Sequence, residues 1–432
     1  MSDVKKLQIA IIGAGIAGLT TAIALQNHPG LDVHVFERAT ELREIGASIA
    51  LGPNGMRTLD RLGIEAALTD DVAFRNTVTG WPHIYRHFKT SEILSKDAYE
   101  GQVERRHYTS RYYRAHLQQA LLAHVEPSRI HLSKAFASLS SSPSGALIVH
   151  FTDSSTAPAD LVLGADGIHS PVRRHFIPSS RPKWTGWVTF RSVFPISHVS
   201  HIKGLPEEAS HYLSHDRTLF ISRLGRDLYT VVGSYQSDPD AADAPWKDAV
   251  WNQEGDTKIL KEYYKDWSPV VKDIIAAVPH TRIYPNASAE GIESWILGNG
   301  RVTLAGDAAH AHGGAFAAGG SLAIDDAWAF ANAVEYIFPR KSEVVLEAGN
   351  IAKALRIYER TRKAHTDRVL KTVHKGNLAK IGRIGRAETD EELRKRAADR
   401  EDMAWLHEHD VLAAFREAVR KEDGYGLVEA RL

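Results

Sequence analysis

Residues 8–38 read QIAIIGAGIAGLTTAIALQNHPGLDVHVFER, and the rest of the chain is interpreted around this stretch. The run Gln8–Ile12 is apolar and rich in β-branched residues, which is typical of a strand buried on both faces. Apolar residues from Leu19 to Leu25 predict a helix, and Val33–Phe36 predicts a second strand. This order of strand, helix and strand predicts a βαβ unit.

Gly13, Gly15 and Gly18 lie between the first strand and the helix at GxGxxG spacing. Gly13 allows a tight turn, Gly15 lets the backbone approach a pyrophosphate, and Gly18 lets helix and strand pack closely. The free N–H groups and the dipole at the helix start then face the phosphates. Glycines also mark ordinary turns, but here the strand, the helix and an acidic strand end occur together. The stretch therefore predicts dinucleotide binding.

Glu37 ends the second strand, at the position where a carboxylate accepts hydrogen bonds from the adenosine ribose. A carboxylate there would repel a 2′-phosphate, so FAD or NAD fits this site and NADP does not. Arg38, the next residue, is also expected to contact the cofactor. For Arg43 two interpretations stay open, contact with a phosphate and exposure to solvent.

The composition is that of an ordinary globular protein and excludes several kinds of site. Lys plus Arg and Asp plus Glu number 53 each among 432 residues, so no overall charge favours nucleic acid or an anionic membrane. Cysteine is absent, which excludes disulfides, thiolate metal sites and cysteine nucleophiles. Glycines interrupt the apolar run Ile9–Leu25, so we expect no membrane span and no signal peptide there. We expect a cytoplasmic protein without a metal site.

Two later segments repeat the pattern of a strand that ends in a glycine-bearing turn. The strand expected at Ala159–Leu163 runs into GADGIHSPVRR, where Ser170 and Pro171 open a helix. The strand expected at Arg301–Ala305 runs into a loop of glycine, alanine and histidine, and then into a helix from about Ser321 to Phe338. We expect Asp325 and Asp326 in the first turn of that helix, where carboxylates match the dipole.

Two further helices are expected from apolar periodicity. The first spans Arg105–Val125, with Arg106, Arg111 and Arg114 near its start. Cations at a helix N-terminus oppose the dipole, so either an anionic partner lies there or the arginines form a solvated basic face. The second, Ile351–Lys380, reads as a long amphipathic helix.

Taken in order, the motifs at Gly13–Gly18 with Glu37, at Gly164–Arg173 and at Gly306–Ala327 resemble the three FAD signatures of the single-component flavoprotein aromatic hydroxylases. Within that family the chain is most similar to salicylate-hydroxylase-like enzymes and their fungal relatives, over roughly residues 7–380. LVLGADGIHSPVRR matches the middle signature throughout. The resemblance implies an α/β fold with a Rossmann-like FAD-binding domain, an inserted and mostly antiparallel β-sheet substrate domain, and C-terminal helices.

Segment by segment, residues 1–180 are expected to form the first part of the FAD-binding domain. Residues 181–285 contain strand-like runs separated by polar turns and are expected to form the substrate-binding sheet layer. Residues 286–340 are expected to return to the FAD-binding domain with the GD motif, and residues 341–432 to form a C-terminal helical region.

The resemblance also implies roles for single residues. Gly13, Gly15 and Gly18 would hold the FAD pyrophosphate, and Glu37 would bind the adenosine ribose. The other implied cofactor residues are Ala50 beside the isoalloxazine, Arg114 leading the helix over the cofactor, Asp166 in a motif associated with FAD and nicotinamide nucleotide, Asp307 on the ribityl chain, and Gly319 and Gly320 beside the ring. Tyr358, Glu359 and Arg362 resemble the YExxR signature of the C-terminal helix.

One segment departs from the family pattern. The family usually carries a Pro-x-x-Gly loop shortly after GDAAHA, and here Gly314 and Ala317 occupy those positions. The loop is smaller and more flexible as a result, so the flavin C4a geometry is not carried over. A flavin that binds but hydroxylates poorly is one possible consequence.

The reaction that the resemblance implies is hydroxylation of a phenolic or salicylate-like aromatic substrate. NADH or NADPH would reduce FAD, and O2 would add at flavin C4a to give a hydroperoxide whose distal oxygen is transferred to the ring. Since the substrate needs phenolate character, a cation or base should lie nearby. The single GxGxxG motif is consistent with transient docking of the nicotinamide nucleotide in a shared groove.

Two residues are candidates for the substrate side. Arg191, in WVTFRSVF, matches an arginine that fungal dearomatising relatives use to hold a phenolate or carbonyl, and an ordinary salt bridge is the alternative. His312 is a candidate base or substrate hydrogen-bond partner, whereas His310 is expected to be structural. The further candidate donors, for which core or rim packing is the alternative, are Tyr212, Tyr229 and Tyr235.

Other functions stay open at this point. The same scaffold could serve a flavoprotein reductase or oxidase without oxygen insertion, or the oxidative dearomatisation of a phenolic polyketide. A non-catalytic flavin-binding module is a further alternative, but it leaves Arg191 and the small-residue loop without a task. A monomer or a homodimer is expected, with no nucleic acid partner.

Overall fold

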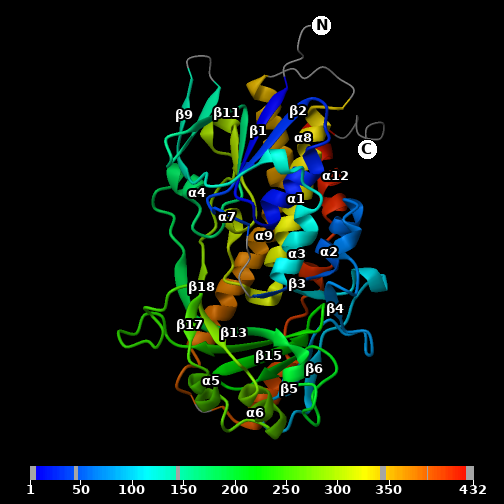
Figure 1. The fold of residues 1–432 in the computed structure, drawn as a ribbon, viewed down its shortest axis with the longest axis vertical. Helices are drawn as coiled ribbons and strands as arrows, with labels where there is room; N and C mark the ends of the chain where they lie inside the picture. Colours follow the sequence, from blue (N-terminus) through cyan, green and yellow to red (C-terminus); the bar gives the residue numbers. More distant parts are fainter. Residues whose placement is uncertain (1–5, 43–46, 143–145, 341–346, 387, 425–432) are drawn as a thin grey trace.

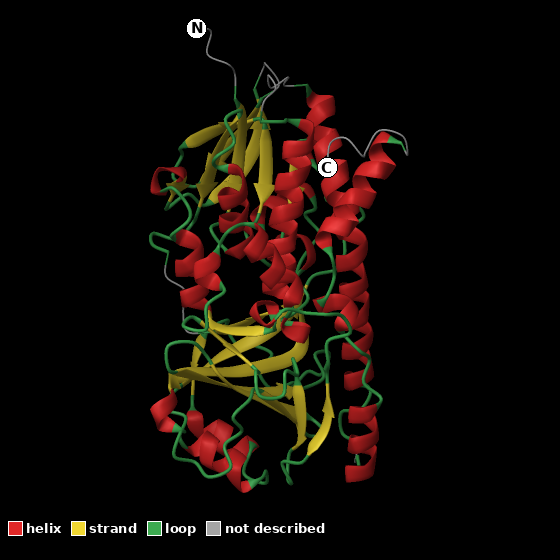
Figure 2. Ribbon diagram, turned by 90° about the vertical axis from the view of Figure 1, so that its right-hand side faces the viewer, coloured by secondary structure: helices red, strands yellow, loops and turns green. Residues whose placement is uncertain are grey.

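The computed structural model describes residues 6–42, 47–142, 146–340, 347–386 and 388–424. An α/β layer lies at one end of the molecule and a β-sheet layer at the other (Figure 1). A long helix, α9 (Ala348–Ile381), runs along the side from the first layer to the second (Figures 1 and 2). The predicted fold class, an α/β body with a separate and mostly antiparallel sheet and C-terminal helices, is confirmed.

Five parallel strands form the sheet of the α/β layer, in the order β19-β12-β1-β2-β8. Their bounds are β1 Leu7–Ile12, β2 Leu31–Phe36, β8 Ile130–His131, β12 Leu161–Gly164 and β19 Val302–Leu304. β-Branched and leucine side chains of β1, β2 and β12 are buried on both faces, as expected for a covered parallel sheet. Because β1, β12 and β19 are neighbours, the three glycine-bearing turns that follow them meet at one edge of the sheet.

Helices pack against this sheet on the side of α1, and the strand β11 contacts β1. Helix α1 follows the first glycine turn and packs against α8, which follows the last one. The helix bounds in this layer are α1 Ile16–Leu25, α2 Pro53–Arg61, α3 Arg114–Leu122, α4 Pro171–Phe176, α7 Asp307–His310 and α8 Gly319–Ile337. Since α8 begins at Gly319, Asp325 and Asp326 lie beyond its first turn, and the prediction that they match the dipole there is wrong.

The predicted helix Arg105–Val125 is also wrong in its first half. Residues Ser110–Tyr113 form a strand, β7, and α3 begins only at Arg114. β7 lies between β3 (Ser48–Leu51) and β4 (Ala73–Arg75), and Tyr112 is fully buried with its hydroxyl donating to Ala67 O at 2.7 Å. Aromatic residues favour strands, and this pairing with distant segments overrides the helical periodicity.

An antiparallel sheet of β9 (Phe136–Ser141), β10 (Leu147–Phe151) and β11 (Thr156–Ala159) stands beside the parallel sheet. Its loops lead the chain from the edge strand β8 back to β12, which lies between β1 and β19. None of the helices that the structure describes is long and apolar enough to cross a bilayer.

The second layer is an eight-stranded sheet in the order β17-β18-β13-β16-β15-β14-β5-β6. All its pairs are antiparallel except β14 with β5. The bounds are β5 Ile84–His87, β6 Ile93–Lys96, β13 Lys183–Pro195, β14 Ser210–Leu213, β15 Arg217–Arg223, β16 Leu228–Gln236, β17 Gln253–Gly255 and β18 Thr281–Ser288. The layer that we expected within residues 181–285 thus draws two strands from earlier in the chain.

Helices α5 (Thr257–Tyr263) and α6 (Pro269–Ala276) cover the outer face of this sheet, where they bury apolar side chains such as Leu260 and Ile274. The other face is turned toward the α/β layer (Figure 2). At 1.5 Å per residue, the 34 residues of α9 span about 50 Å, which is enough to pass both layers. The chain then continues through α10 (Asp390–Ala398), α11 (Ala404–His407) and α12 (Val411–Asp423).

Candidate functional site

The first glycine turn is shaped by its own packing and leaves one position open. Gly13 has φ +108°, and a Cβ there would lie 2.4 Å from Ala165 O. A Cβ on Gly18 would lie 1.9 Å from Gly13 O, so helix and turn require glycine at both positions. A Cβ on Gly15, by contrast, would meet nothing within 4 Å. Gly15 also precedes α1 without a side-chain cap, so the helix N–H groups face open space.

Glu37 lies at the end of β2 against this turn. Its carboxylate accepts hydrogen bonds from Ala14 N at 2.8 Å and from Ala39 N at 2.9 Å. The half-buried carboxylate therefore supports the glycine turn itself, a task that the sequence did not reveal. Arg38 is exposed next to it. Arg43 lies outside the described residues.

Asp166 follows β12 and carries an unsatisfied oxygen. Oδ2 accepts a hydrogen bond from Val172 N at 3.0 Å, whereas Oδ1 is buried and has no partner within the described chain. Burial raises the pKa of Asp166 to about 6, against the opposing effect of hydrogen bonds from Ser170 and Val172. Native proteins rarely leave a buried oxygen unpaired, so Oδ1 is open to a hydrogen-bond donor that the described chain does not supply.

A cleft of about 1500 Å³ lies between the two layers. Sites for one small ligand commonly measure roughly 300–1,000 Å³, so this cleft has room for more than one. Eight of the expected site residues line it: Gly15, Ala50, Arg114, Arg191, Asp307, His312, Gly319 and Gly320. The other five expected residues lie outside its lining: Gly13, Gly18, Glu37, Arg38 and Asp166.

The turn after β19 presents one carboxylate to the cleft. Gly306 has φ +59°, and Asp307, the first residue of α7, is exposed while the four residues before it are buried. The start of α8 is close to β3, because a Cβ on Gly320 would lie 2.7 Å from Leu51 Cδ2. Small residues therefore let the backbone of α8 border the cleft directly.

The loop between α7 and α8 is strained. Gly313 and Gly314 have φ values of +71° and +73°, and Phe316 and Ala317 adopt +57° and +53°. Glycine takes such angles freely, but alanine and phenylalanine do so at a cost of roughly 1–2 kcal/mol each. The position where the family pattern has glycine is Ala317, so the loop keeps a conformation suited to glycine without having one there.

His312 lies on this loop with neither ring nitrogen satisfied. Its side chain is buried, and Nδ1 and Nε2 have no hydrogen-bond partner among the described residues. Burial lowers its pKa, and the charge of Asp307 opposes that effect only in part. The imidazole is therefore neutral near pH 7 and borders the cleft beside Gly319.

Arg191 projects from β13 into the same cleft. Its Nε donates to Thr189 Oγ1 at 3.2 Å, and its guanidinium lies 5.2 Å from the centroid of the Tyr284 ring. No carboxylate among the described residues lies within ion-pair distance of Arg191, so the ordinary salt bridge held open as an alternative is not seen there. Burial lowers the pKa of Arg191, and Arg114 lowers it further, which means that two cations approach each other at this end of the cleft.

Of the three candidate tyrosines, Tyr212 and Tyr229 are buried in the core of the sheet layer, and only Tyr235 lines the cleft. Tyr284 and Asn286 on β18 also line it and were missed. The alternation of side chains along Thr281–Ser288 could have shown that these residues lie on one face of a strand. The sequence does not show which face of that strand is turned toward the α/β layer.

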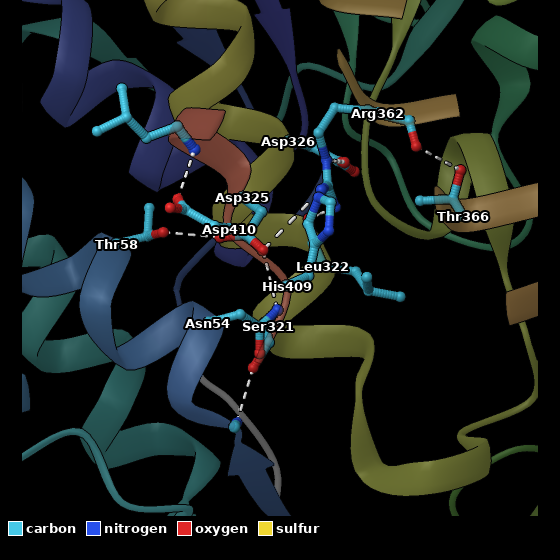
Figure 3. Close-up of polar contacts among 12 residues, drawn as sticks. Asn54, Thr58, Ser321, Leu322, Asp325, Asp326, Arg362, Thr366, His409 and Asp410 are labelled. Atoms are coloured by element: carbon cyan, nitrogen blue, oxygen red, sulfur yellow. Dashed lines mark hydrogen bonds and ion pairs between the residues drawn. The ribbon is translucent and has the colours of Figure 1, made fainter. Parts of the chain in front are cut away.

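On the side of the α/β layer, a buried charged network joins α2, α8 and α9 (Figure 3). Asp326 accepts hydrogen bonds from Arg362 Nε at 2.8 Å and from Gly306 N at 2.8 Å, and its Oδ2 lies 2.6 Å from His310 Nε2. Asp325 accepts from Asn54 at 2.9 Å and from Thr58 at 2.7 Å. Burial by itself would raise the pKa of Asp326, but the charges of His310 and Arg362 hold that pKa well below its usual range.

This network gives the YExxR residues a structural role. Tyr358 donates to Leu304 O at 2.8 Å, Glu359 accepts from Ser294 Oγ at 2.8 Å, and Arg362 holds Asp326. Tyr358 thus ties α9 to β19, the strand before Asp307, while Glu359 ties it to the segment that precedes β19 and Arg362 ties it to α8. His310 is likewise held in the buried network, which fits the structural role expected for it.

Comparisons with known proteins agree with this geometry. The 6-hydroxynicotinate 3-monooxygenase of Pseudomonas fluorescens is 28% identical over 371 residues, covering 84% of this chain and 92% of that protein. The 6-methylsalicylate 1-monooxygenase of Aspergillus terreus is 28% identical over 388 residues, covering 86% of this chain and 82% of that protein. A solved salicylate hydroxylase substrate complex has a TM-score of 0.77 at 22% identity, covers 96% of this chain and 98% of its own, and so has the same fold.

The family model described as FAD binding domain matches residues 6–371, which include the three glycine-bearing turns and both layers. The open position at Gly15 suits a diphosphate, and the carboxylate of Asp307 at the cleft suits the hydroxyl groups that a dinucleotide also carries. The chain belongs to the FAD binding domain family.

Proposed function

We propose that this protein is an FAD-dependent monooxygenase that hydroxylates a phenolic or salicylate-like aromatic substrate with NAD(P)H and O2. Family membership and relatives named as aromatic monooxygenases support this proposal. The observation that carries it is the pairing of Arg191 with His312 at one cleft, an unneutralised cation and a neutral imidazole beside the loop at the start of α8.

FAD, when bound, supplies the redox and oxygen-activating chemistry, and this chain supplies binding, orientation and charge. In the proposal, Gly15 and the N-terminus of α1 receive the pyrophosphate, Glu37 the adenosine ribose, and Asp307 the ribityl chain. Asp166 accepts a hydrogen bond through its free Oδ1. Gly319 and Gly320 border the ring.

On the substrate side, the guanidinium of Arg191 attracts the phenolate or carboxylate of the ligand. A cation at hydrogen-bond distance lowers the pKa of a phenol and so favours the electron-rich ring that hydroxylation requires. His312 holds the phenolic proton at a ring nitrogen or donates to a substrate oxygen, since its neutral imidazole can do either. Tyr284 and Phe316 give the pocket apolar walls that exclude water.

A substrate panel with FAD-loaded protein tests the proposal. Salicylate, 6-methylsalicylate, 6-hydroxynicotinate and related phenolic acids are added one at a time with NADH or NADPH, and nucleotide oxidation and product mass are measured. At least one compound should stimulate oxidation and gain one oxygen atom. Stimulated oxidation that yields only hydrogen peroxide with every compound would contradict the hydroxylase assignment.

That second outcome describes a flavoprotein oxidase, and the strained loop is the observation that favours it. Ala317 replaces the glycine of the family pattern at φ +53°. A displaced loop would let FAD bind while the substrate ring is held out of position. The ratio of hydrogen peroxide to oxygenated product separates the two functions, and the product's NMR spectrum separates hydroxylation from dearomatisation.

Several finer points stay predictions alongside this function. They are the division of the chain at residues 180, 285 and 340, the choice between NADH and NADPH, a cytoplasmic location, and a monomeric or homodimeric state.

A further inference from the structure

Basic residues gather at one end of the cleft, on elements far from Arg191 in sequence, and four of them influence one another. Lys380 comes from the last turn of α9, Arg383 from the residues just after that helix, Arg396 from α10 and Arg400 from the segment after α10, and all four line the cleft. The chain as a whole is neutral, with 53 basic and 53 acidic residues. This concentration of positive charge is therefore a local feature.

Little in the described chain neutralises these cations. Arg396 Nε pairs with Glu388 at 2.8 Å. Within the described ranges, no carboxylate lies within 4.0 Å of the charged atoms of Lys380, Arg383 or Arg400. The Nε of Arg400 is buried and has no hydrogen-bond partner among the described residues. These three cations thus lack a direct ion pair in the described chain, while Asp97 acts on Arg400 and Glu388 acts on Arg383 from a longer distance.

Aromatic rings hold two of these charges in place. Lys380 Nζ lies 4.9 Å from the centroid of the Trp187 ring on β13. Arg400 lies 3.6 Å from the centroid of the Tyr85 ring on β5, and its Nη2 donates to the Tyr85 hydroxyl at 2.6 Å. Cation–π contacts of this kind position a charge without cancelling it.

The proximity of the four cations is unfavourable by itself. Loss of hydration, together with Arg383, Arg400 and Arg396, lowers the pKa of Lys380 from 10.5 to about 8. Like charges raise the free energy of the charged forms, and such perturbed clusters in clefts commonly mark binding sites. A bound anion would remove the repulsion.

The cation cluster lies too far from Arg191 to belong to the same binding centre. Trp187, under Lys380, and Arg191 both line the cleft from β13, four residues apart on one face of the strand. At about 3.3 Å per residue they are roughly 13 Å apart along the strand. A monocyclic phenolic acid is too short to contact both centres.

We infer that Lys380, Arg383 and Arg400 form a second anion-binding subsite at the α9 end of the cleft, which takes a phosphate or carboxylate group of a molecule entering the cleft. The inference rests on the proposed function, because that function names the two molecules that could bring an anionic group into the cleft. One is the diphosphate of the nicotinamide nucleotide, for which the chain has no second glycine fingerprint, and the other is an acidic group on a substrate longer than one ring. The rings of Trp187 and Tyr235 add stacking surface for either.

Binding to the FAD-loaded protein tests the subsite without turnover. The double variant Lys380→Gln/Arg383→Gln removes two charges, while Lys371→Gln removes one from an exposed position of the same helix outside the cleft lining. ADP is the diphosphate probe, and 4′-hydroxybiphenyl-4-carboxylate, an acid longer than one ring, is the carboxylate probe; each is titrated calorimetrically at constant ionic strength. Lys380→Arg keeps the charge and should bind as the parent does.

We expect the dissociation constant of one probe to rise about tenfold in the double variant, as the loss of charge-assisted hydrogen bonds predicts, and not in Lys371→Gln. Weaker ADP binding identifies the nucleotide as the source, and a matching rise in KM for NADH or NADPH with kcat changed less than about twofold supports it. Weaker binding of the biphenyl carboxylate with unchanged ADP binding identifies the substrate's acid group.

Unchanged binding of both probes would overturn the subsite. Lys380 also lies in the last turn of α9, where a cation favours the helix dipole. A purely structural role would lower the melting temperature and leave both dissociation constants as they are, which also overturns the inference. If the panel yields no oxygenated product while probe binding still weakens, the proposed function fails and the subsite stands.

Discussion

At the scale of single residues, Arg191 brings a guanidinium into the cleft that no carboxylate of the described chain neutralises. We expect Arg191→Ala to raise KM for the aromatic substrate about 10- to 100-fold while FAD stays bound, because charge-assisted hydrogen bonds are lost. Steady-state kinetics and the flavin absorbance of the purified variant measure this. Arg223→Ala, which removes an exposed cation from β15 of the same sheet outside the cleft lining, serves as the control and should leave KM unchanged. Equal KM values for Arg191→Ala and the parent would remove Arg191 from the site.

Asp166 makes a residue-scale prediction about pH. Its folded pKa of about 6 lies above the ordinary value of 3.8, so its ionised form is disfavoured in the FAD-free protein. Its contribution to stability is fully present below about pH 4 and is lost as pH rises through 6. Asp166→Asn lacks this titration and keeps an acceptor for Val172 N. As pH rises from 4 to 7, the free energy of unfolding of the variant should increase relative to that of the parent, by on the order of 2–3 kcal/mol. Urea denaturation across that range measures the gain, and a constant difference would contradict the buried, unpaired carboxylate.

At the scale of elements, the turn before α1 contains one glycine that the packing of the fold requires and one that the binding of the ligand requires. A Cβ on Gly18 would clash with Gly13 O, whereas a Cβ on Gly15 would meet only open space. Gly18→Ala should therefore destabilise the FAD-free protein by about 1–3 kcal/mol or more, as overpacking does. Gly15→Ala should change its stability by less than about 1 kcal/mol and still weaken FAD binding at least about tenfold, because the added methyl group points to where the pyrophosphate approaches.

Denaturation of the FAD-free variants and fluorescence titration with FAD test both expectations. If Gly15→Ala binds FAD as tightly as the parent does, the phosphates do not lie at the start of α1.

Elements also show where sequence reasoning succeeds and fails. The strand β1, helix α1 and strand β2 follow from local apolar runs and glycine spacing, and α9 follows from its periodicity, with ends at Ala348 and Ile381 close to the expected Ile351 and Lys380. β7 was expected to be helical, because its pairing with β3 and β4 depends on residues far away in sequence. The same limit applies to the cleft. Tyr284 and Arg400 reach it from strands and loops whose relative placement no local pattern encodes.

At the scale of the whole molecule, the buried network around Arg362 connects helices from the two ends of the chain (Figure 3). Arg362→Met leaves Asp325 and Asp326 buried without their guanidinium. Removing one partner of a buried ion pair commonly costs about 3–5 kcal/mol, so we expect the free energy of unfolding to fall by that amount. Arg360→Met, on the same helix as Arg362, removes a largely exposed guanidinium from Glu422 of α12, which keeps Arg356 as a partner, and should cost less than about 1 kcal/mol. Chemical denaturation measures both, and similar losses for the two variants would contradict the importance of the network.

The strand order of the parallel sheet has a consequence for how the chain folds. β12 pairs with β1 on one side and with β19 on the other, and the chain builds most of the eight-stranded sheet before it reaches β19. During synthesis the edge of β12 therefore stays unpaired until Val302–Leu304 has emerged, and the turn with Asp307 forms later still. Contacts over such long sequence separations slow folding and leave strand edges open to aggregation. Capture of the cofactor is accordingly a late event in folding, and FAD supplied during expression or refolding should raise the yield of native protein.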